Sequence, residues 1–162
     1  MTGRHDKGGS LVKGTEKIII FFASGGYTGY VPVAPGTAAS LAAFLVYYFI
    51  IPANNLYYLI MLAVLAAAGT FLSGEAEKIL GEKDSPHIVI DEICGYLVTM
   101  AFLPKNLCLA AAGFVIFRAL DIIKPAFLRK LEKIEGGMGV MIDDILSGVI
   151  GCVVLNAISL IF

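Results

Sequence analysis

The sequence predicts an all-α fold set into a membrane, and three features support this: high hydrophobicity, long apolar segments and helix-breaking residues between them. Of the 162 residues, 58% are hydrophobic, whereas an average soluble domain is about half apolar. The excess lies in runs close to the roughly 20 residues that a spanning helix needs. We therefore expect a polytopic membrane helical bundle of about four to five spans with short interfacial helices.

Two segments are expected to precede the first spanning helix. Residues 1–15 are polar and glycine-rich and are predicted to form a flexible N-terminal tail, which leaves 16–162 as a single membrane domain. An apolar stretch at Ile18–Ala23 is too short to span. It leads into Ser24–Gly36, a loop rich in glycine, proline and tyrosine.

Five apolar segments follow, and each is bounded by residues that interrupt a helix. Pro52 and Pro104 end the first and the third because proline lacks the N–H that a helix interior needs. The polar turn Gly81–Pro86 ends the second, Pro125 follows the fourth, and a glycine turn at Gly136–Gly139 precedes the fifth. The expected helices are Thr37–Ile51, Leu56–Leu80, Ile88–Leu103, Leu107–Ile123 and Val140–Phe162, with a basic amphipathic stretch at Phe127–Ile134.

Short connections make the helices alternate in direction, which places the acidic residues on one side of the membrane. Asp91 and Glu92 begin the third helix, Asp121 lies near the end of the fourth, and Asp143 and Asp144 lie near the start of the fifth. Nearly all of the lysines and arginines accompany them. By the positive-inside rule this side faces the cytoplasm.

Carboxylates that converge from three helices repel one another unless a cation lies between them. Any one of them could instead be an interfacial residue that a helix dipole stabilises, but ionisable groups at membrane depth are costly and mark functional sites. No Cys or His accompanies them, so an all-oxygen site suits Mg²⁺ better than zinc. The predicted metal ligands are Asp91, Glu92, Asp143 and Asp144.

Arg118, Asp121 and Lys124 are spaced by three residues and share one helical face. They could form an ion pair at a helix end, or a phosphate site in which the two cations bind phosphoryl oxygens while Asp121 orients them or holds the metal. The loop before Thr37 could be a simple turn, or could present backbone N–H groups and the Thr37 hydroxyl to an anion. We predict Thr37, Arg118 and Lys124 as substrate-binding residues.

Tyrosines and one histidine are assigned structural positions. Tyr47, Tyr48, Tyr57 and Tyr58 flank the turn between the first two helices and are predicted to form an aromatic belt at the interface opposite the acidic side. His87 could be a base or a ligand, but a surface turn residue is the more frequent case.

Three blocks of sequence are characteristic when taken together and in order. They are Pro32–Thr37 with Ser40-Leu41; Ile88–Glu92 with Gly95; and Phe117-Arg118 through Asp121-Ile122 to Lys124-Pro125, followed by Gly136–Gly139 through Asp143-Asp144 with Gly148. In these blocks the chain resembles the phosphatidylglycerophosphatase A family, from about Gly29 to Gly151.

The resemblance implies a multi-pass phosphatase of the bacterial inner membrane that depends on Mg²⁺ and has its active site on the cytoplasmic side. The implied reaction converts phosphatidylglycerol phosphate to phosphatidylglycerol and phosphate in phospholipid biosynthesis. The expected partners are the phospholipid substrate and the membrane, with no nucleic acid, and the oligomeric state is left open. The expected catalytic residues are Asp91, Asp121 and Asp144.

We hypothesise metal-assisted hydrolysis, in which Mg²⁺ neutralises phosphoryl charge and lowers the pKa of a bound water. Arg118 and Lys124 would stabilise the developing charge, and Asp121 could act as a general base or as a covalent nucleophile.

One alternative function is an ion or solute transporter component that uses interfacial carboxylates, although a transport path needs such groups across the whole bilayer. The other is a phosphatase of another membrane lipid phosphate.

Overall fold

The computed structural model describes residues 7–124 and 134–160, and this part of the chain is helical, with no strand. The all-α prediction is therefore confirmed for the described residues, while the stretch predicted at Phe127–Ile134 lies almost entirely outside them. The elements are α1 (Lys7–Ala23), the 3-10 helix η1 (Thr28–Tyr30), α2 (Pro35–Phe49), α3 (Asn55–Leu80), α4 (Ile90–Thr99), α5 (Leu107–Ile123) and α6 (Gly137–Ser159).

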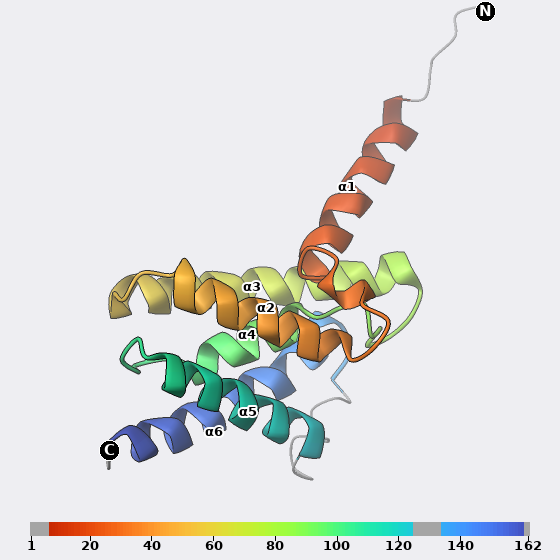
Figure 1. Ribbon diagram of the computed structural model, residues 1–162. Helices are drawn as coiled ribbons and strands as arrows, with labels where there is room; N and C mark the ends of the chain where they lie inside the picture. The colour runs from red at the N-terminus through yellow and green to blue at the C-terminus, as the bar shows by residue number, and fades with distance from the viewer. Residues whose placement is uncertain (1–6, 125–133, 161–162) are drawn as a thin grey trace, which may run out of the picture.

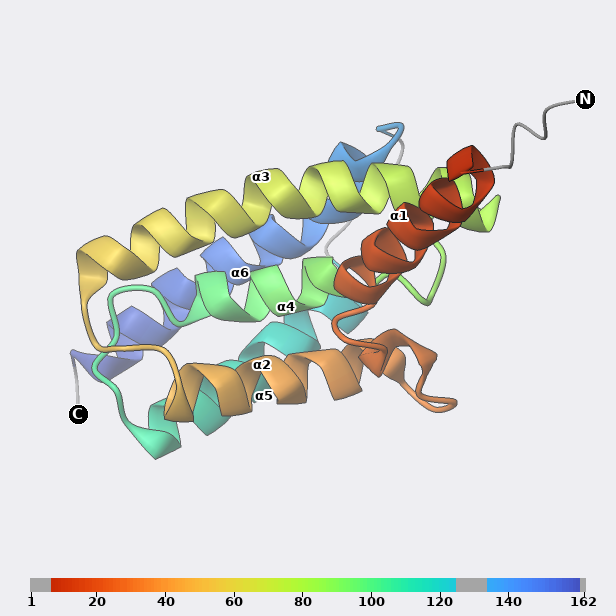
Figure 2. The ribbon, with the colours of Figure 1, turned by 90° about the horizontal axis from the view of Figure 1, so that it is seen from above.

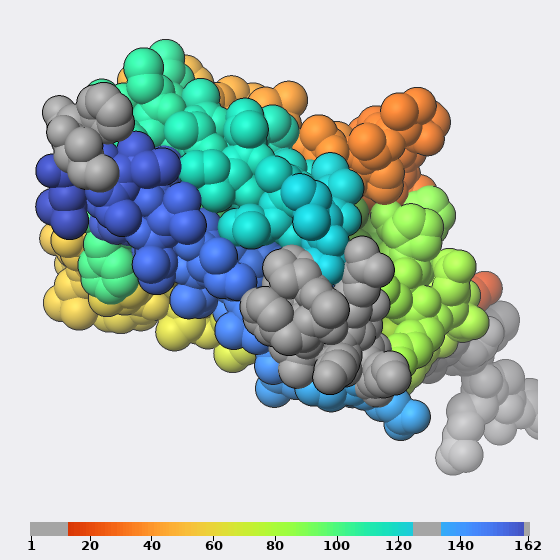
Figure 3. Space-filling model, turned by 90° about the horizontal axis from the view of Figure 1, so that it is seen from below, coloured from red at the N-terminus to blue at the C-terminus, as the bar shows by residue number. Residues whose placement is uncertain are grey.

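Helices α2 to α6 lie side by side in one bundle, and α1 projects from one end of it (Figures 1 and 2). The central helix is α4, which packs against α2, α3, α5 and α6. On the face seen in Figure 3, α5 and α6 lie against each other. We call the end that holds the first residues of α2, α4 and α6 the near end, and the end that holds the α2–α3 and α4–α5 connections the far end.

Local capping signals explain where several helices begin and end. At the far end, Asn54 Oδ1 accepts a hydrogen bond from the Tyr57 N–H at 3.1 Å, and Asn106 Oδ1 accepts one from the Cys108 N–H at 2.8 Å. These bonds satisfy N–H groups that the first turn of a helix leaves without a partner. At the near end α3 stops at Gly81, whose φ of 69° is favourable for glycine.

Two helices differ in length from the expectation. Helix α4 has only 10 residues in place of the predicted segment Ile88–Leu103. The Val89 N–H bonds to the Ala23 carbonyl oxygen at 2.9 Å instead of joining a helix, and Phe102 adopts a φ of 65° beyond the other end. Helix α1 is longer than the apolar stretch expected there, because it begins at Lys7, inside the segment 1–15 that was predicted to be a tail.

Two helices, α3 and α6, are long and apolar enough to cross a membrane. Of the most apolar window of the 26-residue helix α3, only 22% is buried, so most of its apolar side chains face outward. Phe71, for example, is 64% exposed. Helix α2 is apolar but has 15 residues, and α5 has 17. Membrane association is thus supported by two helices, and the count of four to five spans stays a prediction.

The predicted aromatic belt is wrong for two of its four members. Tyr47 and Tyr58 are buried in the core at the far end, where their rings pack edge to face with centroids 6.0 Å apart. The Tyr58 hydroxyl donates a hydrogen bond to the Leu97 carbonyl oxygen at 2.6 Å. A buried tyrosine needs such an acceptor, and spacing along the sequence does not reveal one. Of the other two, Tyr57 is exposed and Tyr48 is half-buried.

Candidate metal and phosphate site

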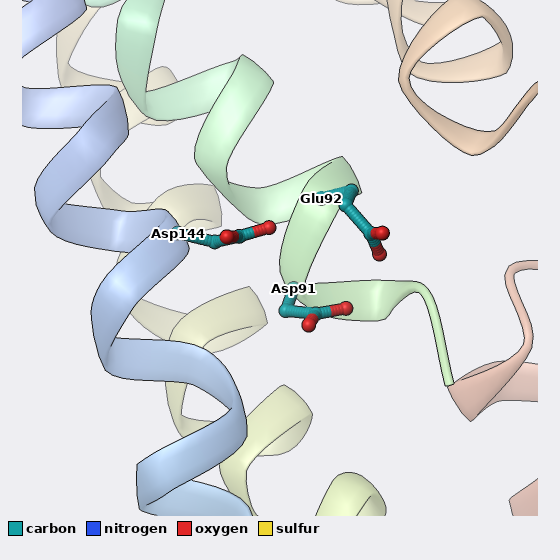
Figure 4. A group of neighbouring side chains, drawn as sticks. All are labelled: Asp91, Glu92 and Asp144. Atoms are coloured by element: carbon teal, nitrogen blue, oxygen red, sulfur yellow. The ribbon is translucent and has the colours of Figure 1, made fainter. Parts of the chain in front are cut away.

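Three carboxylates from two helices meet at the near end of the bundle. Asp91 and Glu92 lie in the first turn of α4, and Asp144 lies early in α6. One oxygen from each lies within 4.8 Å of the others, and Figure 4 shows Asp144 pointing from α6 toward α4. Asp91 is 8% exposed and Asp144 is 2% exposed. The predicted convergence of carboxylates is therefore present for these three.

Two glycines allow α4 and α6 to approach closely enough for this. A Cβ at Gly95 would collide with the Asp144 carbonyl oxygen and with the Phe117 ring, and a Cβ at Gly148 would collide with the Gly95 carbonyl oxygen. The two main chains are thus in direct contact between the acidic residues. This contact sets the distance between the carboxylates on α4, Asp91 and Glu92, and the carboxylate on α6, Asp144.

Each of the three carboxylates has an oxygen that is buried and lacks a hydrogen-bond partner: Asp91 Oδ1, Glu92 Oε2 and Asp144 Oδ2. A buried anion without a partner is costly, and three of them together also repel one another. Oxygens alone, with no sulfur or imidazole among them, are the ligands of hard divalent cations such as Mg²⁺. The donor set therefore fits a divalent cation, and its chemistry does not identify which one.

Arg118 of α5 and Lys124, which directly follows α5, form a ladder of ion pairs beside these carboxylates. Arg118 Nη1 lies 2.5 Å from Asp121 Oδ2 and 4.0 Å from Glu92 Oε1. Lys124 Nζ lies 2.5 Å from Asp143 Oδ2 and 3.9 Å from Asp121 Oδ1. The ladder thus connects the phosphate-binding residues predicted on α5 to the acidic residues of both neighbouring helices.

Arg118 keeps part of its guanidinium available. Its Nε atom is buried and has no hydrogen-bond partner, although the planar fork of an arginine can donate five hydrogen bonds. A phosphoryl group is the ligand that such a fork binds in a bidentate manner. The predicted phosphate site is thus compatible with the geometry around Arg118.

Asp143 is separated from the group formed by Asp91, Glu92 and Asp144. Successive residues of a helix point about 100° apart, so Asp144 faces α4 while Asp143 reaches Lys124. The structure therefore places Asp143 in the ion-pair ladder, and its predicted role as a metal ligand stays a prediction.

The N-terminus of α2 adjoins the same site. A Cβ at Gly36 would collide with the Glu92 carboxylate and lie 3.2 Å from Arg118 Nη1. Thr37 follows in the first turn of α2 and is half-buried. The free N–H groups of a helix N-terminus favour anions, so this end of α2 supplies positive potential next to Arg118.

His87 holds the loop that leads to α2. Its Nδ1 lies 3.0 Å from the Gly29 carbonyl oxygen, and its ring stacks on Tyr30 with centroids 4.3 Å apart. This structural role agrees with the expectation that His87 is a turn residue.

Sequence reasoning did not identify the part that Gly36, Gly95 and Gly148 play in assembling the site. Gly95 follows Asp91 by four residues and Gly148 follows Asp144 by four, and that spacing within an apolar helix is a signal that could have found these two.

Comparisons with known proteins agree with the arrangement. The sequence profile of the family described as Phosphatidylglycerophosphatase A matches residues 21–159. A protein of Escherichia coli named Phosphatidylglycerophosphatase A is 40% identical over 136 residues, covering 82% of this chain and 78% of that protein. One of Haemophilus influenzae with the same name is 33% identical over 144 residues, covering 87% and 88%.

A third relative carries a different name. It comes from Bacteroides thetaiotaomicron, is provisionally named a phosphatidylinositol-3-phosphatase, and is 34% identical over 138 residues, covering 80% of this chain and 86% of that protein. No solved structure matches the chain.

Proposed function

This chain belongs to the phosphatidylglycerophosphatase A family, and from that premise we propose that it hydrolyses the phosphate monoester of phosphatidylglycerol phosphate. The products would be phosphatidylglycerol and phosphate, as a step of phospholipid biosynthesis. The observation that carries the proposal is the group of three carboxylates, each with an unpartnered buried oxygen, beside the half-buried Arg118, whose Nη1 lies 4.0 Å from Glu92 Oε1. Such a site can hold a divalent cation and a phosphoryl group side by side.

We propose that Asp91, Glu92 and Asp144 hold Mg²⁺, with Asp143 close by in the ladder. When bound, the ion would supply charge neutralisation at the phosphoryl group and a water of lowered pKa. The three carboxylates would hold the ion between packed helices, where Asp91 and Asp144 are buried and Glu92 is half-buried.

The cations and α2 bind the phosphoryl group in this proposal. The free edge of Arg118 donates to two phosphoryl oxygens, and the N–H groups at Gly36 and Thr37 face the same charge. Lys124 adds a further positive charge. These groups stabilise the charge that develops on the phosphoryl oxygens during transfer.

Asp121 acts as the residue that orients both cations. Its Oδ2 atom lies 2.5 Å from Arg118 Nη1 and its Oδ1 atom lies 3.9 Å from Lys124 Nζ, so each oxygen faces a cation. This arrangement favours an orienting role over the nucleophilic role considered for Asp121 from the sequence.

We further propose that the chain is a multi-pass protein of the bacterial inner membrane with its site on the cytoplasmic side. The support comes from the outward-facing apolar side chains of α3 and α6 and from the positive-inside rule. The lipid would then keep its acyl chains in the bilayer while its phosphate enters the near end. A transporter role is not favoured, because the carboxylates cluster at one end.

Phosphate release from purified protein tests the proposal, with phosphatidylglycerol phosphate and phosphatidylinositol 3-phosphate as parallel substrates. We expect activity that requires Mg²⁺ and prefers the first lipid. Asp91→Asn and Asp144→Asn should each lower the rate by about 100-fold or more, since each removes a charge at the reacting centre.

Glu75→Gln is the matched control, because Glu75 is a partly exposed carboxylate of α3 whose Oε1 lies 2.7 Å from Nζ of exposed Lys78, outside the group of three carboxylates. It should leave the rate unchanged. Full activity in both Asp→Asn variants would rule out the proposed site, and a preference for the inositol lipid would reassign the substrate.

A further inference from the structure

Helix α1 has an outward face that carries large apolar side chains. The helix projects from the near end of the bundle and packs on α3 (Figures 1 and 2). Ile18, Phe21 and Phe22 lie on its outward face and are 59%, 42% and 54% exposed. Because they are spaced by three and four residues, they form one continuous surface. Grouped apolar side chains of this kind mark a binding surface.

Charge follows the apolar residues along the same face. Lys13 and Lys17 are exposed, and they precede Phe21 by about 12 Å and about 6 Å along the helix axis. Moving away from the bundle, the face therefore changes from apolar to cationic. A membrane interface changes in the same order, from acyl chains to anionic headgroups, over roughly 5–7 Å.

A hollow between α1 and η1 continues this surface. Its volume is about 500 Å³, and it is lined by two lysines, one glutamate, two tyrosines and two isoleucines: Lys13, Lys17, Glu16, Tyr27, Tyr30, Ile20 and Ile79. Cations and phenol groups beside an apolar side chain suit an amphipathic ligand, because long polar side chains keep their heads in water and their stems on apolar surface. A phospholipid headgroup has that character.

We infer that α1 is an interfacial helix that binds the anionic phospholipid surface on the near side of the membrane. Ile18, Phe21 and Phe22 enter the acyl region, and Lys13 and Lys17 contact the headgroup phosphates. The inference rests on the membrane embedding proposed above. It adds a function for α1: the helix continues directly into the loop before α2, so binding lipid would hold that loop at the depth of the substrate phosphate.

A single fluorescent reporter can test this because the chain contains no tryptophan. The full-length Phe22→Trp variant is placed in vesicles of phosphatidylglycerol and phosphatidylcholine whose acyl chains are brominated near the headgroup. Bromine quenches tryptophan only on contact. We expect the variant to lose most of its fluorescence relative to the same vesicles without bromine, and to retain phosphate release.

Phe71→Trp is the matched control, because Phe71 is another exposed phenylalanine, 64% against 54% for Phe22, and lies on α3, which is long and apolar enough to span a membrane. Quenching of Phe71→Trp without quenching of Phe22→Trp would overturn the inference and leave the membrane embedding intact. Absence of quenching in both variants would overturn the embedding as well.

The charge component is tested by adding Lys13→Gln and Lys17→Gln to the Phe22→Trp chain. We expect the added substitutions to reduce quenching in vesicles with phosphatidylglycerol, and to have no effect in vesicles of phosphatidylcholine alone. Equal quenching in both compositions, with and without the lysines, would overturn the preference for anionic lipid.

Discussion

The far end and the near end of the bundle differ in how their polar side chains are satisfied. At the far end, polar groups bond to the main chain: the Tyr58 hydroxyl donates to the Leu97 carbonyl oxygen, and Lys105 Nζ donates to the Ile51 carbonyl oxygen at 2.6 Å. Both bonds connect separate segments of the chain. Polar residues at this end therefore stabilise the fold.

At the near end, polar side chains are left in excess. Among the described residues, every buried side-chain oxygen or nitrogen without a hydrogen-bond partner lies outside the far end, and four belong to Asp91, Glu92, Arg118 and Asp144. Unpartnered buried groups in a native structure call for an explanation. The difference between the ends is compatible with a ligand, such as a divalent cation, at the near-end carboxylates.

The largest expected effect is on stability in the presence of metal. Mg²⁺ at 100 times its Kd should stabilise the wild-type protein by about 2.7 kcal/mol, and Asp144→Asn should abolish this gain. Without metal, Asp144→Asn should be the more stable protein, because it removes one of three carboxylates that repel one another. Thermal unfolding with and without Mg²⁺ measures both effects. If Mg²⁺ stabilised the Asp144→Asn protein as much as the wild type, the proposed difference between the near end and the far end would be wrong.

Arg118→Lys should have the next largest effect. The lysine keeps the positive charge but loses the planar fork. Losing one charged hydrogen bond to the phosphoryl group should lower kcat/KM by about 10- to 100-fold. Steady-state phosphate release measures this, with thermal unfolding as the check on folding. A less stable protein with unchanged kcat/KM would mean that Arg118 serves the fold alone.

Gly95→Ala tests whether contact between main chains sets the site. The added methyl group would collide with the Asp144 carbonyl oxygen and the Phe117 ring, so unfolding should become easier by about 1–3 kcal/mol, and activity should fall because the carboxylates move apart. Gly14→Ala is the control, since nothing lies within 4 Å of a Cβ there. That helical substitution should be neutral or stabilising by about 0.5–1 kcal/mol.

The smallest effect is expected at the far end. Tyr58→Phe removes the hydrogen bond to Leu97 and should cost about 0.5–1.5 kcal/mol of unfolding free energy. Phosphate release should not change, because Tyr58 lies at the opposite end from the carboxylates. Loss of activity without loss of stability would show that the two ends are coupled.

The up-and-down order of the helices could be predicted from the sequence because prolines and short connections allow few alternatives. That order alone brings Asp91, Glu92 and Asp144 to one end, so the core of the site was predictable. The same reasoning could not separate Asp143 from Asp144, because both share one level and differ only in the direction of their side chains. The direction of each side chain depends on how α6 is rotated about its own axis, and the packing of α6 against α4 determines that rotation.

Tertiary contacts also explain the remaining differences. Helix α4 is shorter than its apolar run because the Val89 N–H bonds to Ala23, a partner 66 residues away in the chain (89 − 23). Tyr47 and Tyr58 are core residues because their rings pack against each other, and the hydroxyl of Tyr58 has the Leu97 carbonyl oxygen as its acceptor. Hydropathy describes each segment by itself and contains no information about such partners.

Gly95 and Gly148 also determine how closely the carboxylates of α4 and α6 can approach. A side chain at either position would hold the two helices apart, whereas with glycine the two main chains come into contact. Ca²⁺ requires oxygens at about 2.3–2.6 Å and accepts irregular shells, whereas Mg²⁺ requires about 2.0–2.1 Å in a near-octahedral shell. A close approach of α4 and α6 would therefore favour the shorter ligand distances of the smaller ion.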